Sequence, residues 1–290
     1  MHFVKAKNLL FKHEDMFCLA PYRGCTHGCI YCESRSHKYK IKHDFEDVEI
    51  MQRTPELLDA ELASRKRKFM ISMGYLNDPY MPCEKDLNIT QRLLSVIHKH
   101  QFGATVLTKS DLILRDLPII RRIQRSTKFV AQISITTFDD SMSRILEPHV
   151  CASSRRFNAL KVLHENHIPT LVRLTPILPF INDTEDNIAS ILEACAAYGV
   201  KGVFCPDMGL TLHKGCHEYF FACLDTHFPT LKKMYLEHFG DSEEILSLNN
   251  DRLMQVFHDL CQKHNMLHTP DECLSWLNTY DKPGQQLTLF

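Results

Sequence analysis

Apolar residues gather in short runs that recur along the first 206 positions of the chain. Five of these runs are FMISM (69–73), ATVLT (104–108), FVAQISI (129–135), TLVRLTPI (170–177) and VKGVFCP (200–206). Each has the length of a buried strand. We expect a sixth strand at MFCLA (16–20). The pattern therefore predicts six strands that build one core.

Between these runs, apolar residues recur at helical spacing. Examples are Leu57, Leu58 and Leu62; Leu93, Leu94 and Ile97; Leu112, Ile113, Leu117, Ile120 and Ile123; Phe157, Leu160 and Leu163; and Ile188, Ile191 and Leu192. Alternation of strand and helix predicts parallel βαβ units with right-handed crossovers. The expected fold class is α/β: a partial barrel of six β/α units over 16–206, shorter than the full eight-stranded barrel of about 250 residues.

The pattern changes after Pro206. Residues 216–280 have helical spacing, with breaks at Phe228–Pro229, Gly240–Asp241 and Thr269–Pro270. The predicted domains are an N-terminal extension (1–15), the partial barrel (16–206), a C-terminal helical region (207–280) and a flexible tail (281–290).

Composition excludes some classes of protein. The formal net charge of the 290 residues is −1, so no global basic field points to nucleic acid. The first 15 residues do not resemble a signal peptide, and no apolar run approaches the roughly 20 residues of a membrane helix. We expect a cytoplasmic protein without a membrane partner. In that compartment clustered cysteines point to metal or redox chemistry rather than disulfides.

Three of the twelve cysteines are clustered in PYRGCTHGCIYC (21–32), at Cys25, Cys29 and Cys32. A closed zinc site takes four protein ligands, usually in paired motifs, and no matching pair follows downstream. A 4Fe–4S cluster held by three cysteines instead leaves one iron open to an outside ligand. The spacing favours the cluster over zinc.

A C-x₃-C-x₂-C motif after the first barrel strand, with Tyr31 before its last cysteine, resembles the radical S-adenosyl-L-methionine (SAM) superfamily. The resemblance implies that Cys25, Cys29 and Cys32 hold a 4Fe–4S cluster, whose open iron is chelated by the methionine part of SAM. A reducing partner such as flavodoxin or ferredoxin then drives cleavage of SAM. The product is a 5′-deoxyadenosyl radical that abstracts hydrogen from a substrate. We therefore expect an enzyme with these two cofactors.

Five ordered segments over residues 20–183 carry the resemblance further. They are APYRGCTHGCIYC, SMGYLNDPYMPCE, VLTKSDLILRDL, ILEPHVCASSRR and LTPILPFIND. Together they resemble the spore photoproduct lyase-related, or DNA repair photolyase-like, branch of the superfamily. This implies lyase-like chemistry on nucleic acid in DNA repair. The alternatives are radical modification of RNA or protein, and a DNA- or clamp-associated iron–sulfur redox sensor. The substrate, the fate of SAM and the oligomeric state stay open.

The same resemblance assigns SAM-binding residues. They are Tyr31, Gly74, Asn77, Asp78, Lys109, Ser134 and Arg173. Gly74 is expected to contact the SAM amino group through its backbone, and Lys109 to meet the carboxylate. Ser134 and Arg173 end strands, where barrel enzymes place their chemistry.

Alternatives stay open for two of these assignments. In the first, Lys109 is only a surface charge that precedes a helix and does not bind SAM. In the second, Arg173 forms an ion pair with Glu147 or Asp78 inside the barrel. Glu147–Pro148 and Arg115–Asp116 are expected to organise loops.

The loop after the second predicted barrel strand provides the candidate catalytic residues. Enzymes similar to spore photoproduct lyase use a cysteine near this loop as a hydrogen donor to the product radical. Here GYLNDPY (74–80) offers Tyr75 and Tyr80 but no cysteine. Cys83 takes that role only if the loop folds back. The candidates are therefore Tyr75, Tyr80 and Cys83, and the departure argues against thymine-dimer reversal.

Two further segments suggest partners. Basic and aromatic residues alternate in SRSHKYKIKHDF (34–45), a pattern suited to tracking phosphates and stacking a base, or else to a solvated loop. The last residues, QLTLF (286–290), resemble the peptide that binds the bacterial DNA polymerase sliding clamp. The resemblance implies that Gln286 bonds at the rim of a clamp pocket, and that Leu287, Leu289 and Phe290 supply its apolar part. Packing of the tail on its own barrel is the alternative.

Overall fold

The computed structural model describes residues 1–281, and a seven-stranded sheet lies at its centre. The strand order is β10-β9-β8-β7-β6-β3-β2, with β2 antiparallel to β3 and the other pairs parallel. The strands are β2 (Leu10–His13), β3 (Met16–Leu19), β6 (Met70–Met73), β7 (Gly103–Thr108), β8 (Phe129–Ser134), β9 (Thr170–Arg173) and β10 (Gly202–Phe204). Six parallel strands at the predicted positions confirm the α/β fold class.

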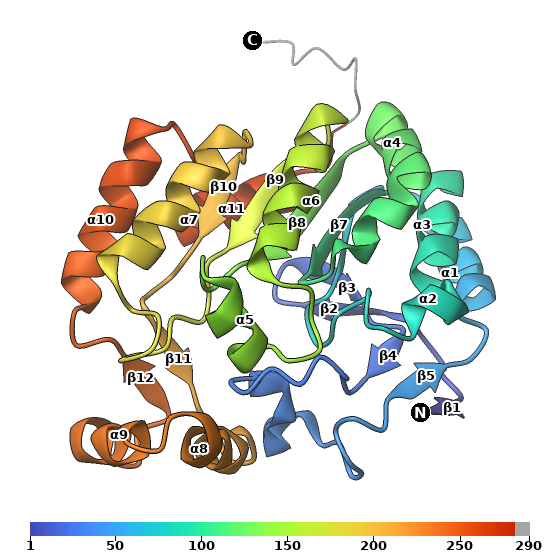
Figure 1. The fold of residues 1–290 in the computed structure, drawn as a ribbon. Coiled ribbons are helices and arrows are strands. Elements are labelled where there is room, and N and C mark those ends of the chain that lie inside the picture. Colours follow the sequence, from blue (N-terminus) through green and yellow to red (C-terminus); the bar gives the residue numbers. More distant parts are fainter. Residues whose placement is uncertain (282–290) are drawn as a thin grey trace.

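Helices cover the outer face of this sheet (Figure 1). The longer ones are α1 (Thr54–Ala63), α3 (Ile89–Lys99), α4 (Leu117–Ser126), α6 (Ser153–Glu165), α7 (Glu185–Ala197) and α10 (Asn250–Lys263). Each predicted apolar stripe is buried; in α4, Ile120 and Ile123 are fully inaccessible. Burial of one apolar face is what fixes such helices in place. Every helix among residues 1–281 is too short or too polar to cross a bilayer.

Several short elements lie outside the predicted pattern. They are β1 (His2–Val4), β2, β4 (Tyr22–Arg23), β5 (Glu49–Met51), β11 (Gly209–Thr211), β12 (Glu244–Leu246), η1 (Glu33–Arg35), η2 (His37–Tyr39), α2 (Glu84–Leu87) and α5 (Asp140–Leu146). The short helix η3 (Asp111–Asp116) covers Leu112 and Ile113, where the apolar spacing predicted the start of a helix. Strands β1, β5 and β4 form a second sheet, and β11 pairs with β12. Elements of two to seven residues are too short for periodicity to define them. The N-terminal extension therefore supplies a strand to each of two sheets.

The C-terminal region contains α8 (Cys216–His227), α9 (Leu231–Phe239), α10 and α11 (Pro270–Asn278), broken near the predicted positions. Helix α11 ends against the sheet, where Lys128 Nζ donates hydrogen bonds to the carbonyls of Trp276 and Thr279. Tyr280 Oη donates to the carbonyl of Gln101 over 2.9 Å. The end of the described chain is thereby fixed beside the amino ends of β7 and β8. The proposed clamp-binding residues Gln286, Leu287, Leu289 and Phe290 lie outside the described residues.

Candidate functional site

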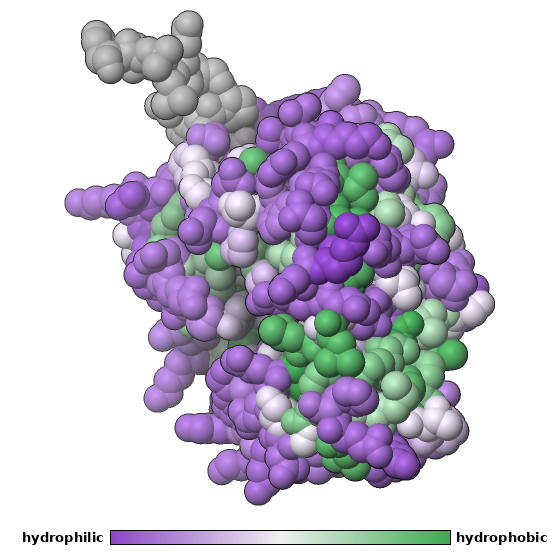
Figure 2. All heavy atoms as spheres, turned by 90° about the vertical axis from the view of Figure 1, so that its left-hand side faces the viewer, coloured by the Kyte–Doolittle hydropathy of each residue, from purple (hydrophilic) through white to green (hydrophobic). Residues whose placement is uncertain are grey.

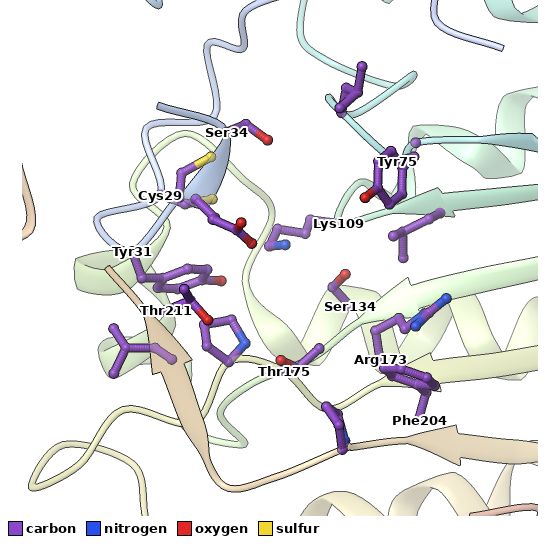
Figure 3. A pocket seen from close by; sticks show the side chains of 18 of the residues that line it. Cys29, Tyr31, Ser34, Tyr75, Lys109, Ser134, Arg173, Thr175, Phe204 and Thr211 are labelled. Atoms are coloured by element: carbon purple, nitrogen blue, oxygen red, sulfur yellow. The ribbon is translucent and has the colours of Figure 1, made fainter. Parts of the chain in front are cut away.

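A cavity of about 690 Å³ opens at the carboxyl ends of the parallel strands. Residues that follow or end these strands line it: Gly74, Asn77, Asp78, Thr108, Lys109, Ser134, Arg173 and Phe204. Cys25, Cys29 and Cys32 lie on another wall. Figure 3 shows Cys29 and Tyr31 facing Arg173 and Phe204 across the cavity, with Lys109 and Ser134 between them. The structure thus gathers all seven predicted SAM-binding residues and all three cysteines around one space.

The cysteine loop depends on two glycines in the left-handed region. Gly24 has φ +86°, and a Cβ there would lie 2.4 Å from the carbonyl oxygen of Phe45. Gly28 has φ +71°, and a Cβ there would lie 3.0 Å from the His149 ring. A larger residue at either position would strain the turn or displace its neighbour. The glycines therefore allow the loop to lie tightly against two other segments.

Backbone hydrogen bonds fix this loop from both sides. The Cys25 amide donates to the Phe45 carbonyl over 3.1 Å. The Ile30 amide donates to Leu146 over 3.0 Å, and the His149 amide donates to His27 over 3.1 Å. Phe45, which precedes β5, and residues 146–149 therefore fix the position of the loop.

A buried network joins the cysteine loop to β8. Tyr31 Oη donates to one oxygen of Glu147, and Arg156 Nη2 donates to the other; the Glu147 and Arg156 side chains are 0% exposed. Arg156 Nη1 also donates to the Ser134 carbonyl over 3.1 Å. Burial works to raise the pKa of Glu147, but Arg156 and Lys109 outweigh it and hold the pKa below its usual value. Glu147 is therefore an ionised link between the loop and the strand.

Asp78 orders two of the loops that line the cavity. Its Oδ1 accepts from Thr108 Oγ1 over 2.6 Å and from the Tyr80 amide over 2.8 Å, and its Oδ2 accepts from the Lys109 amide over 2.7 Å. Burial works to raise the pKa of Asp78, but the imidazole of His27 and these hydrogen bonds lower it to about 2. Since both oxygens have protein partners, the carboxylate ties the loop after β6 to the end of β7.

His27 is a cavity residue that the sequence did not single out. Its side chain is 4% exposed and lines the cavity from inside the cysteine motif. Its Nε2 lies 3.1 Å from Asp78 Oδ2, but outside hydrogen-bonding direction, and its Nδ1 has no partner among residues 1–281. The sequence signal that could have identified His27 is its position between Cys25 and Cys29. A buried imidazole with a free nitrogen is suited to meet a bound polar group.

Arg173 faces the cavity without a carboxylate partner in the described part of the chain. Its Nε donates to Gln132 Oε1 over 2.8 Å, and its guanidinium lies 4.0 Å from the centre of the Phe204 ring. The alternative of an ion pair with Glu147 or Asp78 is wrong, because those acids pair with Arg156 and His27. Burial lowers the pKa of Arg173 to about 10, so it keeps its charge at neutral pH.

The three catalytic candidates separate in the structure. Tyr75 lines the cavity, is 41% exposed and packs on the ring of His13. Tyr80 is buried elsewhere, where its Oη donates to Asp116 Oδ2 over 3.0 Å. Cys83 directly precedes α2 and does not line the cavity, so the loop does not fold back. Tyr75 is the one candidate that the fold brings to the cavity.

The loop expected to follow phosphates is partly built into the protein. The Arg35 guanidinium lies between the rings of Phe45 and Tyr219, at 4.7 and 3.7 Å from their centres, and pairs with Glu46. Arg23 donates to the Tyr39 carbonyl over 3.1 Å. Contacts within the protein therefore occupy Arg35 and Arg23, whereas Lys38, Lys40 and Lys42 of the 34–45 segment are exposed.

The C-terminal region supplies a wall of the cavity that the sequence did not predict. Residues of β11 and β12 line it, including Thr211, Glu244 and Leu246. Figure 2 shows apolar residues gathered on the lower part of the face that carries this region. Leu236, Leu246 and Leu248 are exposed. Of these three leucines, Leu246 also lines the cavity.

The thiols of Cys25, Cys29 and Cys32 are a donor set for a metal group. None is in a disulfide among the described residues. A tetrahedral zinc ion with bonds of about 2.3 Å holds sulfurs about 3.8 Å apart. Within residues 1–281 the three sulfurs do not form a group closer than 4.8 Å. A 4Fe–4S cluster binds each sulfur through a different iron, so three soft thiol ligands without a fourth suit such a cluster.

The part of the chain that contains most of the site is similar to known proteins. Residues 19–201 match the model of the Radical SAM superfamily. An uncharacterized protein of Methanocaldococcus jannaschii is 29% identical over 171 residues, covering 58% of this chain and 63% of the relative. An uncharacterized protein of Mycobacterium tuberculosis is 26% identical over 223 residues, covering 74% of this chain and 65% of the relative. The chain thus spans somewhat less than two thirds of the length of these relatives.

Solved structures share the fold. Spore photoproduct lyase complexed with dinucleoside spore photoproduct matches with a TM-score of 0.67 and 11% identity, over 92% of this chain and 81% of that one. Streptococcus suis SuiB bound to S-adenosylmethionine matches with a TM-score of 0.52 and 11% identity, over 88% of this chain and 52% of that one. At such identities the likeness concerns the fold alone. The family match covers more than half of the chain, which therefore belongs to the radical SAM superfamily, whose members use a 4Fe–4S cluster and SAM.

Proposed function

We propose that this chain is a radical SAM enzyme that acts on nucleic acid by lyase-like chemistry of the kind used in DNA repair. The observation that carries the proposal is the cavity itself, with three thiols on one wall and the strand ends on the other. Its volume of about 690 Å³ falls in the range of sites that enclose ligands of the size of SAM. When bound, the cofactors supply a 5′-deoxyadenosyl radical that removes a hydrogen atom from the substrate.

The protein's own residues divide the work of binding and orientation. Cys25, Cys29 and Cys32 would hold the cluster. The Lys109 ammonium lies 5.8 Å from the centre of the Tyr31 ring, close to the cysteine loop, and would receive the SAM carboxylate. Arg173, whose cation has no acidic partner in residues 1–281, would meet a further anionic or polar part of SAM or substrate.

Lys109→Met is expected to weaken SAM binding by about 10- to 100-fold, because a hydrogen bond between charged groups contributes about 1.5–3 kcal/mol. Equilibrium binding of SAM to the anaerobically reconstituted protein measures this. Lys99→Met is the control, since Lys99 pairs with Asp59 on the surface. Equal affinity of Lys109→Met and the unchanged protein, with normal iron content, contradicts the assignment.

A nucleic-acid substrate has two supports. A solved enzyme that shares the fold binds a dinucleoside photoproduct. The chain also ends in QLTLF, the segment that resembles a clamp-binding peptide. The cavity offers no cysteine as a hydrogen donor to the product radical, because among the described residues only the three cluster cysteines line it. We therefore assign Tyr75, at the mouth, as the residue that meets the product radical.

Tyr75→Phe is expected to keep SAM cleavage while product formation falls, because the phenol hydrogen is lost but the cavity keeps its shape. Product and 5′-deoxyadenosine are counted together by mass spectrometry. Tyr80→Phe is the matched control, since Tyr80 bonds Asp116 away from the cavity. Unchanged product yield from Tyr75→Phe removes this role.

A protein substrate is the second candidate, favoured by charge at the mouth. Glu14, Asp207 and Glu244 line the cavity and are exposed, and none has a salt-bridge partner in the described chain. Unpaired carboxylates repel phosphates and attract basic side chains. These acids are the observation that favours a basic peptide as the second candidate substrate.

One experiment separates these functions. The reconstituted protein is incubated without oxygen with SAM, a strong reductant, and either lesion-containing oligonucleotides or basic peptides. The proposal expects 5′-deoxyadenosine and a changed oligonucleotide mass. A changed peptide alone selects the second candidate. If no 5′-deoxyadenosine forms under any condition, the enzyme assignment is wrong and a redox sensor is the remaining function. If it does form, replacing the strong reductant with reduced flavodoxin or ferredoxin tests the natural electron donor.

Deleting the last five residues is expected to abolish retention of the protein by an immobilised sliding clamp. The reason is that such short peptides carry most of their affinity in a few anchors. Replacing only Gln286 and Phe290 with alanine should have the same effect, since these two residues are expected to be anchors of the peptide. Equal retention of the full and shortened chains removes the clamp as a partner.

A further inference from the structure

We propose that His2, His43 and Glu49 form a site for one divalent transition-metal ion, best suited to zinc, outside the cavity. His2 lies on β1 and Glu49 on β5, while His43 lies in the connection between η2 and β5. His2 and Glu49 are direct partners in the parallel register of β1 and β5. Partners in register point to the same side of a sheet, so the fold itself places these two side chains together.

The three side chains converge closely enough for one ion. Each offers one ligand atom, and these atoms all lie within 4.8 Å of one another. His43 Nε2 lies 3.0 Å from Glu49 Oε1, and the rings of His2 and His43 meet edge to face with centres 5.1 Å apart. Nitrogen and oxygen ligands of tetrahedral zinc, at about 2.0–2.2 Å from the metal, lie about 3.3 Å apart. Small side-chain rotations bring the three atoms to that spacing.

Both imidazoles already have the outer partner that metal ligands usually have. His43 Nδ1 lies 2.9 Å from the carbonyl oxygen of Asp44, to which it donates. His2 Nδ1 lies 3.1 Å from Asp47 Oδ2. A histidine that binds a metal through one nitrogen almost always donates from the other to a carbonyl or carboxylate. These contacts leave Nε2 of each ring as the nitrogen available to an ion.

A simple ion pair explains only part of this arrangement. Without metal, protonated His43 pairs with Glu49 Oε1, and Arg23 Nη1 lies 3.4 Å from Glu49 Oε2. That pairing accounts for two of the three residues and leaves the convergence of His2 unexplained. Arg23 occupies the second carboxylate oxygen, which leaves Oε1 for the metal. Two imidazoles and one carboxylate are a zinc set, and zinc exceeds ferrous iron in affinity for such ligands.

A bound ion would join three segments that support the cysteine loop. It would link β1, β5 and the connection before β5. Phe45 in that connection accepts the hydrogen bond from the Cys25 amide over 3.1 Å. The ion would therefore brace the wall behind the cluster without touching the cavity residues.

Zinc analysis of untagged, anaerobically reconstituted protein tests the site. The protein is dialysed against zinc chloride, and zinc and iron are counted by atomic emission. We expect one zinc per chain in addition to the cluster iron. His43→Ala and His2→Ala should each lose that zinc, and Asp47→Asn should weaken binding about 10- to 100-fold, as expected for an outer partner. Iron content should fall at most slightly, because the ion supports the cysteine loop only through the hydrogen bond from the Cys25 amide to Phe45.

His100→Ala is the matched control, because His100 also pairs with a carboxylate, Asp59, at 2.8 Å, but far from this cluster in sequence and without a third ligand in residues 1–281. It should keep the zinc. The site is refuted when the unchanged protein holds no more zinc than His43→Ala, or when His100→Ala loses as much. If His43→Ala fails to fold, His2→Ala decides, since the His2 side chain is 42% exposed.

Discussion

Cys29→Ala is expected to remove the iron–sulfur cluster and to reduce 5′-deoxyadenosine formation to the background. Each of the three thiolates binds a different iron, so two thiolates leave a second iron without a protein ligand. Among residues 1–281, no cysteine outside the motif lines the cavity, so none is placed to replace the lost sulfur. Iron and sulfide analysis after anaerobic reconstitution, followed by mass spectrometry of SAM products, measures both effects.

Cys223→Ala is the control for this experiment. Cys223 is half-buried in α8, as Cys32 is half-buried in its loop, but it does not line the cavity. It should retain full iron and full SAM cleavage. A Cys29→Ala protein with the normal iron content and the normal yield would show that the cluster is bound elsewhere.

Glu147→Gln is expected to lower the free energy of unfolding by about 3–5 kcal/mol, because it leaves the buried Arg156 guanidinium without its counter-charge. The Glu147 and Arg156 side chains are 0% exposed. Tyr31 lies between two cluster cysteines in sequence and also bonds Glu147, so the loop should loosen and its iron content should fall. Urea unfolding, followed by circular dichroism, measures the stability, and iron analysis measures the loop.

Glu185→Gln provides the matched surface control. Glu185 accepts from Arg252 over 2.8 Å, but both side chains are about half exposed. Exposed pairs contribute about 0–1 kcal/mol, so this change should be close to neutral. Similar losses from Glu147→Gln and Glu185→Gln would show that the buried network does not hold the loop.

The sequence predicted the central sheet because buried parallel strands leave a strong signal. Runs such as FVAQISI are apolar on both faces, and helical stripes separate them. Strand β2 was missed because LFKH is four residues long and lies at the sheet edge. β11 and β12 were missed for the same reason, although they close one side of the cavity. Local patterns find core elements, whereas short elements depend on the partner they pair with.

The candidate site was predictable where topology alone places residues. Parallel strands end at one edge, so Gly74, Lys109, Ser134 and Arg173 were bound to meet there. Side-chain direction was not predictable in the same way. Tyr31 and Glu147 are 116 positions apart. Their contact depends on how the chain turns after α5 and packs against the cysteine loop. Such choices are made by packing and hydrogen bonding in three dimensions, which spacing does not encode.

The anchoring of α11 determines where a partner that bound the residues after Asp281 would hold the molecule. Trp276, Thr279 and Tyr280 are held beside the amino ends of the strands, and the cavity opens at the carboxyl ends. A partner that bound the residues after Asp281 would hold the molecule on the side opposite to the cavity opening. Attachment and substrate entry would then use separate surfaces of the molecule.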